Sequence, residues 1–235
     1  MTTPIPIDAD GVALGNAGLP PLRPKDAATV IVIRRDAPRL QVLMGRRAGG
    51  HAFMPDKWVF PGGRIHRADY RVAAASELHP EAAEPLVRTC PPAKARALAL
   101  TAVREMFEET GLILGRPGKA TTKSPEWQAF IATGHLPDLA PLRFVARAIT
   151  PPVRPRRFDA RFFTVDAAHL VSLEPGAGCG ELDETAWFDW EAAAALDLPA
   201  ITRAVLAEVA QRELEPGRPI PFHRFDRGQH RLLAV

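Results

Sequence analysis

Residues 104–112 read Arg104-Glu105-Met106-Phe107-Glu108-Glu109-Thr110-Gly111-Leu112, and this segment says most about the architecture. It closes a helical pattern over 93–110, and its glycine stands where glycine commonly ends a helix. On that helix the three glutamates are spaced i, i+3 and i+4, so their carboxylates share one face. The apolar residues of the pattern point another way and are expected to pack on a sheet.

Three like charges on one helix face repel one another by roughly a few tenths of a kcal/mol per pair, even where the side chains are exposed. A hard divalent cation would offset this repulsion, because Mg²⁺ and Mn²⁺ prefer oxygen ligands. Arg104 precedes Glu108 by four residues and can hold that side chain in place. The alternative is a solvated acidic face on a surface helix.

A second motif lies about forty residues upstream, where Phe60-Pro61-Gly62-Gly63 ends a short strand. Together the two segments resemble the Nudix hydrolase signature G-x5-E-x7-R-E-U-x-E-E-x-G-U, in which U is a bulky apolar residue. Gly63 matches the first glycine, and residues 104–112 match the whole second half. The resemblance covers roughly residues 27–212.

Two departures from the signature stand out. Asp69 occupies the position of the first glutamate in the signature. The shorter side chain can change helix capping or loop geometry at that position more than the chemistry of the site. Between Asp69 and Arg104 lie 34 residues, where the signature has 7. A long surface insertion costs little loop-closure entropy. The sequence resembles a branch similar to coenzyme A diphosphatases, which carries such an insertion, and Arg157-Phe158-Asp159-Ala160-Arg161-Phe162-Phe163 also looks like that branch.

The resemblance implies an α/β fold, a Nudix-type α/β/α sandwich around a mixed β-sheet. It implies catalytic roles for Arg104, Glu105, Glu108 and Glu109, and Mg²⁺ or Mn²⁺ as the cofactor, held by Glu105, Glu108, Glu109 and the carbonyl of Gly63. Glu108 or Glu109 could take the proton of the attacking water, and Glu181 and Glu184 are the candidates for a general base in a later loop. Arg46, Arg47, Arg156 and Arg157 are the candidates for binding substrate phosphates.

The implied activity is hydrolysis of the pyrophosphate linkage in a small-molecule nucleoside diphosphate derivative, with coenzyme A or acyl-coenzyme A as the first candidate. Nucleotide sugars, ADP-ribose, NADH, dinucleoside polyphosphates and capped RNA remain open. A different class is a Nudix-fold module that senses a nucleotide without cleaving it. Nucleic acid is not the expected partner, because the arginines are scattered and the aromatic residues are few.

Composition favours a cytoplasmic protein. The 235 residues carry a net charge of +3 with a sequence pI of about 9.2, a small excess that allows an anionic ligand. No apolar run approaches the roughly 18 residues of a membrane span, and no signal peptide is expected at Met1-Thr2-Thr3-Pro4. Two cysteines make neither a disulfide framework nor a metal cluster, which favours a reducing compartment.

Strands and helices alternate along the chain. We expect a hairpin from runs 29–33 and 40–44, a short strand at 58–60, and further strands at 142–149, 159–165 and 185–190. Helices are expected within 70–92, over 125–133 and after Pro199.

The chain is expected to divide into a Pro-rich N-terminal arm (1–26), the Nudix domain (27–212) and a Pro- and Arg-rich tail (213–235). The insertion at 70–92 should border the substrate cleft. That insertion or the arms are expected to contribute to a homodimer, because arms that cannot bury their apolar residues alone often pack on a partner.

Overall fold

A computed structural model describes residues 22–50, 56–152, 154–176, 178–226 and 229–235. The helices are α1 (Pro80–Val87), α2 (Pro92–Thr110), α3 (Pro125–Ala132), α4 (Trp190–Ala195) and α5 (Ala200–Leu214), with short 3-10 segments η1 (Arg67–Tyr70) and η2 (Ala167–His169). The strands are β1 (Lys25–Arg34), β2 (Gln41–Arg47), β3 (Trp58–Val59), β4 (Gly62–Arg64), β5 (Gly115–Pro117), β6 (His135–Pro137), β7 (Arg143–Ile149), β8 (Phe158–Asp166), β9 (Leu182–Asp189), β10 (Pro221–Asp226) and β11 (Gln229–Ala234).

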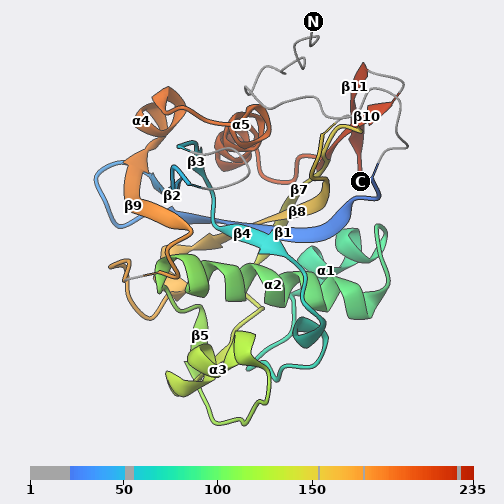
Figure 1. Cartoon of the computed structure of the whole chain (residues 1–235). Coiled ribbons are helices and arrows are strands. Elements are labelled where there is room, and N and C mark those ends of the chain that lie inside the picture. The colour runs from blue at the N-terminus through green and yellow to red at the C-terminus, as the bar shows by residue number, and fades with distance from the viewer. Residues whose placement is uncertain (1–21, 51–55, 153, 177, 227–228) are drawn as a thin grey trace, which may run out of the picture.

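One mixed sheet of nine strands forms the centre of the fold. Its order is β11-β10-β7-β8-β1-β2-β3, with β4 also paired to β1 and β9 to β2. β1 pairs antiparallel with β2, which confirms the expected hairpin, and parallel with β8. A separate two-stranded sheet joins β5 and β6. Figure 1 shows α1 and α2 on one side of the large sheet and α5 on the other, so the expected mixed sheet between helices is confirmed.

The sequence of β1 explains why both faces of the sheet are covered. Val30 and Val32 belong to the apolar cluster on the α2 side, whereas Ile31 and Ile33 belong to the cluster on the α5 side. Because successive side chains of a strand point to opposite faces, a continuous apolar run needs two packed layers.

Helix α2 carries the signature segment and lies across β1. It begins with Pro92 at its first turn and ends at Gly111, whose φ of 72° is a left-handed conformation that favours glycine. Val103 and Met106 are fully buried against the sheet, as their spacing predicts. The packing of this face leaves the glutamates on a side that faces β4.

The insertion at residues 70–92 packs against the core. Its helix α1 contacts α2 and β7, and Val72, Ala82 and Leu86 are buried. The residues that line the large cavity described below do not include 70–92. The insertion therefore does not line this cavity, because its apolar side chains pack into the core; that it borders the substrate cleft stays a prediction.

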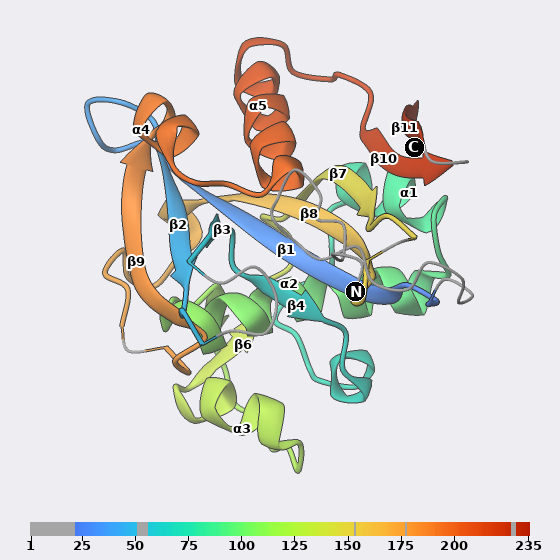
Figure 2. The ribbon, with the colours of Figure 1, turned by 45° about the horizontal axis from the view of Figure 1, so that its top comes forward.

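The expected C-terminal tail is also structured. α5 extends to Leu214, and β10 and β11 form an antiparallel hairpin whose β10 pairs parallel with β7. The guanidinium of Arg147 lies 4.3 Å from the centre of the Phe222 ring, which fastens β10 to β7. Figure 2 shows this hairpin at the edge of the sheet away from β9.

Most of the expected N-terminal arm, residues 1–21, lies outside the described residues. Lys25 and Asp26 already belong to β1. In the described ranges no helix combines the length and apolarity needed to cross a membrane. The homodimer stays a prediction, which light scattering tests against the chain mass of 25.6 kDa.

Candidate active site

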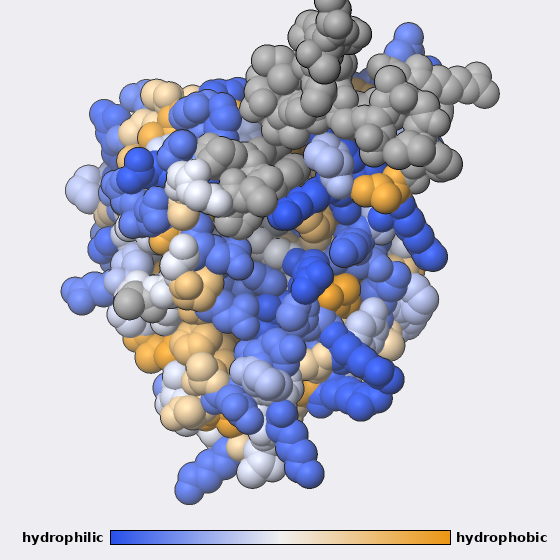
Figure 3. Space-filling model, viewed as in Figure 1, coloured by the Kyte–Doolittle hydropathy of each residue, from blue (hydrophilic) through white to orange (hydrophobic). Residues whose placement is uncertain are grey.

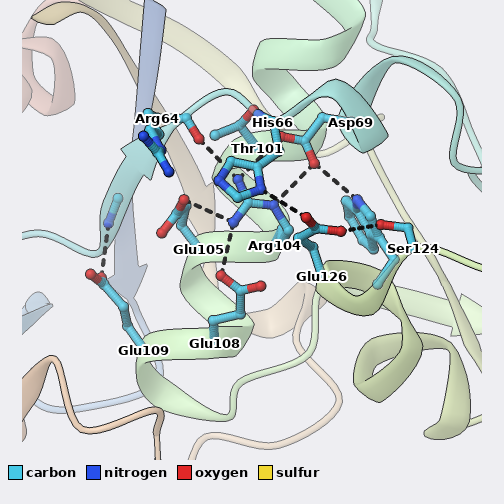
Figure 4. Close-up of polar contacts among 12 residues, drawn as sticks. Arg64, His66, Asp69, Thr101, Arg104, Glu105, Glu108, Glu109, Ser124 and Glu126 are labelled. Atoms are coloured by element: carbon cyan, nitrogen blue, oxygen red, sulfur yellow. Dashed lines mark hydrogen bonds and ion pairs between the residues drawn. The ribbon is translucent and has the colours of Figure 1, made fainter. Parts of the chain in front are cut away.

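The three glutamates of the signature lie together on α2, facing β4 (Figure 4). Glu105 and Glu109 are buried, with 9% and 3% of their surface exposed, whereas the side chain of Glu108 is 30% exposed. Figure 3 shows that mostly hydrophilic side chains cover this side of the molecule. The alternative of a solvated acidic face therefore fails for two of the three carboxylates, Glu105 and Glu109.

Arg104 links these carboxylates. Only 1% of its surface is exposed. Its Nη1 lies 2.8 Å from Glu105 Oε1 and 2.8 Å from Glu108 Oε2, and its Nη2 donates to the carbonyl oxygen of Arg64 at 3.0 Å. The predicted ion pair between Arg104 and Glu108 is present, and Arg104 also reaches back to β4.

Asp69 is fully buried and holds Arg104 from the other side. Its carboxylate accepts from Arg104 Nε at 3.0 Å and from Nη2 at 3.1 Å. It also accepts from Thr101 Oγ1 at 2.8 Å and from Trp127 Nε1 at 2.9 Å. The backbone N–H of His66 donates to it at 2.8 Å, which caps η1. Of the two roles that the sequence allowed, helix capping and loop geometry, Asp69 takes the capping role at η1. It also orients Arg104, the arginine of the signature.

The two glycines of β4 allow the strand to approach the glutamates. The N–H of Gly62 donates to Glu109 Oε2 at 2.9 Å. A Cβ atom at Gly63 would lie 2.6 Å from atoms of the Glu105 carboxylate, far inside van der Waals contact. Gly63 is therefore required by the close passage of β4 over Glu105.

Because the resemblance to the signature implies a catalytic role for Glu105, we expect Gly63→Ala to lower kcat/KM by roughly 100-fold, the cost of displacing such a carboxylate by about 1 Å. The three atoms nearest to the added methyl group all belong to the carboxyl end of Glu105, so the strain falls on that side chain and the melting temperature should change much less than the activity. Gly50→Ala is the matched control, since a Cβ there meets nothing within 4 Å. Equal activity of the two variants, measured by steady-state hydrolysis, would contradict this role of Gly63.

The site concentrates negative charge in a desolvated place. Burial raises the pKa of Glu105 to about 7, with a further contribution from Glu108. Burial and then Glu105 raise the pKa of Glu109 well above its usual range. Burial also raises the pKa of Glu108. Burial and mutual repulsion destabilise the ionised form of these carboxylates, and a bound cation would offset that cost. Carboxylate oxygens are ligands that suit Mg²⁺ or Mn²⁺.

The carboxylates do not surround a common point here. Across the ranges that the structure describes, no three His, Cys, Asp or Glu side chains are grouped closely enough to hold a metal ion. Arg104 engages Glu105 and Glu108, while Glu109 accepts from Gly62. Arg104 contacts one oxygen of each carboxylate, Oε1 of Glu105 and Oε2 of Glu108, so the second oxygen of each lies outside these ion pairs.

A cavity of about 1480 Å³ opens beside this cluster. It is lined at one end by Gly62, Gly63, Glu105 and Glu108. Such a volume exceeds the usual pocket for a drug-sized ligand, roughly 300–1,000 Å³. The site therefore has room for an extended molecule.

The structure separates the candidate residues in each predicted pair. Arg47 lines the cavity and its charge acts on Glu109, whereas Arg46 pairs with Glu184 at 3.5 Å and does not line the cavity. Glu181 also lines the cavity, and its charge helps to raise the pKa of Glu105.

The remaining predicted arginines lie on another part of the same cavity. Arg156 and Arg157 both line it. Arg157 also donates from Nε to the carbonyl of Thr150 at 3.0 Å. Loss of water around its guanidinium lowers the pKa of Arg157.

Two groups of cavity residues were assigned no role from the sequence. His66 lines the cavity, and its Nδ1 lies 3.2 Å from Glu126 Oε1 at the start of α3. No sequence spacing connects these two residues. His223, Phe225 and His230 also line the cavity, on the hairpin that was expected to be a tail. The sequence Asp226-Arg227-Gly228 contains residue types that are common in turns and stands between two short apolar-containing runs, and this pattern was the signal for that hairpin.

The fold is similar to known structures. A Nudix hydrolase from Alicyclobacillus acidocaldarius is 30% identical, with 80% of this chain and 92% of that chain covered at a TM-score of 0.60. The NUDIX domain of Shewanella oneidensis NrtR, crystallised with ADP ribose, is 11% identical, with 82% and 90% covered at a TM-score of 0.50, and supports the fold alone. No protein-family model and no curated protein matches the chain. The signature residues are assembled around Arg104, and a Nudix hydrolase that is 30% identical matches 80% of this chain, so the chain belongs to the Nudix hydrolase family.

Proposed function

We propose that this protein is a divalent-metal-dependent hydrolase that cleaves the pyrophosphate linkage of a nucleoside diphosphate conjugate. The observation that carries the proposal is the carboxylate cluster of α2, of which Glu105 and Glu108 line a large cavity together with Gly62 and Gly63, while the buried Glu109 accepts from the N–H of Gly62. Cationic side chains line the same cavity and suit the phosphates of such a substrate.

In this proposal Glu105, Glu108, Glu109 and the carbonyl of Gly63 hold Mg²⁺ or Mn²⁺. When bound, the cation supplies positive charge that neutralises the pyrophosphate oxygens and makes water a better nucleophile at neutral pH. Asp69 keeps Arg104 in position, so that Glu105 and Glu108 remain oriented toward the cavity. Arg47, Arg156 and Arg157 bind phosphate oxygens.

Glu181 is the preferred general base. Its position on the cavity wall and its electrostatic effect on Glu105 support this choice. Glu184, by contrast, is paired with Arg46. Glu181→Gln should therefore impair hydrolysis more than Glu184→Gln, measured as kcat at saturating substrate.

The first substrate candidate is coenzyme A or acyl-coenzyme A, because the chain resembles that branch and the cavity accommodates an extended molecule. ADP-ribose is a second candidate, since the NUDIX domain of NrtR was crystallised with it. Nucleotide sugars, NADH, dinucleoside polyphosphates and capped RNA complete the panel. Product analysis of this panel with Mg²⁺ or Mn²⁺ tests the proposal. Hydrolysis by Glu108→Gln as fast as by the parent would overturn the site assignment.

Metal addition gives a separate prediction. A cation at one hundred times its dissociation constant stabilises a folded protein by about 2.7 kcal/mol. For a chain of this size, that corresponds to a rise in melting temperature of roughly 5–10 °C. Thermal unfolding with Mn²⁺ and with EDTA measures the difference. An equal rise in the Glu109→Gln variant would place the bound metal elsewhere.

The alternative function is nucleotide sensing without turnover. The basis for this alternative is how the three carboxylates are engaged: Glu105 and Glu108 each give one oxygen to Arg104, and Glu109 accepts from the N–H of Gly62. Calorimetry that shows tight nucleotide binding, together with no product in the presence of Mg²⁺ or Mn²⁺, would establish the sensor.

A further inference from the structure

The C-terminal hairpin presents three rings on one face. His223 and Phe225 are two residues apart on β10, so their side chains share a face, and His230 lies directly opposite Phe225 on β11. The rings of His223 and His230 are stacked, with centroids 5.3 Å apart and planes inclined by 17°. The ring of Phe225 lies 5.5 Å from that of His230. Together they form a nearly continuous ring surface.

This surface belongs to the cavity of the active site. All three rings line it, together with Glu105 and Glu108. Phe222 alternates with His223, so it points to the opposite face, where it packs against Arg147 of β7. That contact holds the hairpin with its three rings toward the cavity.

The chemistry of the rings suits a flat, uncharged partner. Burial and the neighbouring His230 lower the pKa of His223, so this imidazole is neutral at pH 7. Nδ1 of His223 lies 3.2 Å from Nε2 of His230, and this contact fixes the two rings relative to each other. Preordered rings lose little freedom when another ring stacks on them.

Strand order separates the three rings from the glutamates. Four steps lead from β10 through β7, β8 and β1 to β4. At about 4.8 Å per strand, this is roughly 19 Å. A group bound by the rings therefore lies away from the linkage that the glutamates would cleave.

We propose that His223, Phe225 and His230 form a subsite for a planar nitrogen heterocycle at the far end of the bound nucleotide. This inference rests on the proposed function, because it assumes that the cavity accepts a nucleotide. Arg154 lines the same cavity and provides positive charge for a phosphate attached to that end.

Calorimetric titration in EDTA tests the subsite without requiring turnover. The probes are ADP-ribose, which carries a heterocycle, and inorganic pyrophosphate, which carries none. His230→Ala should weaken ADP-ribose binding roughly 5- to 150-fold, the equivalent of one stacked base. Pyrophosphate binding should stay unchanged. His230→Phe, which keeps a flat ring, should retain ADP-ribose binding.

Leu233→Ala is the control for the hairpin, because Leu233 is 46% exposed and lies opposite Phe222, on the face away from the three rings. Equal weakening of both probes by His230→Ala, an unchanged affinity for ADP-ribose, or no ADP-ribose binding by the parent would overturn the subsite. Selective loss of ADP-ribose binding without hydrolysis of any substrate would support the subsite and reject only the proposed function.

Discussion

The Glu109→Gln variant is expected to lose about 100-fold or more in kcat/KM, while its melting temperature in EDTA stays the same or rises. The activity falls because a neutral amide stabilises a cation and the developing charge much less than a carboxylate does. The stability does not fall, because the oxygen of the substituted amide can still accept the hydrogen bond from Gly62, which spans 2.9 Å in the parent. It rises if removing a buried charge beside Glu105 relieves desolvation and repulsion.

Two measurements check this prediction. Steady-state hydrolysis of whichever conjugate the parent cleaves gives kcat/KM, and thermal unfolding in EDTA gives stability. Glu84→Gln is the control, since Glu84 is exposed on α1 and its substitution removes the same charge. A Glu109→Gln variant that is unstable, or as active as Glu84→Gln, would contradict the assigned role.

The Asp69→Asn variant is expected to be destabilised by roughly 3–5 kcal/mol, the usual cost of removing one partner of a buried ion pair. Asp69 is fully buried and accepts hydrogen bonds from Arg104, Thr101, Trp127 and the backbone of His66. An amide cannot accept from all of these donors, and it leaves part of the Arg104 charge uncompensated. The expected fall in melting temperature is roughly 6–20 °C.

Asp36→Asn is the matched control, because Asp36 forms an exposed ion pair with Arg34 at 2.7 Å. Exposed pairs contribute about 1 kcal/mol or less. Asp69→Glu restores the residue of the family signature and keeps the charge, so it should recover much of the stability. If the two asparagine variants melted at the same temperature, the proposed role of Asp69 as the anchor of Arg104 would be wrong.

Local patterns predicted much of the fold. The run at 29–33 predicts a strand and the turn after it predicts a hairpin, because both depend on neighbouring residues. The helix of the signature is likewise visible in its apolar spacing and its terminal glycine. The C-terminal hairpin was missed, since its many charged residues and prolines resemble an arm, and only pairing with β7 makes it part of the sheet.

For the site, spacing along α2 determined that Glu105, Glu108 and Glu109 share a face and that Arg104 can reach Glu108. The resemblance to the Nudix signature added Gly63 to the predicted site residues. Spacing could not determine that two glutamates are buried, since burial depends on the passage of β4 across α2.

Tertiary structure alone decided which of several similar residues face the cavity. It separated Arg47 from Arg46 and Glu181 from Glu184, because neighbouring positions near the end of a strand can face different surroundings. It also brought Trp127 to Asp69 and the rings of the C-terminal hairpin to the active-site cavity. These contacts join residues far apart in the chain, so packing of the sheet and its helices determines them, and local sequence does not.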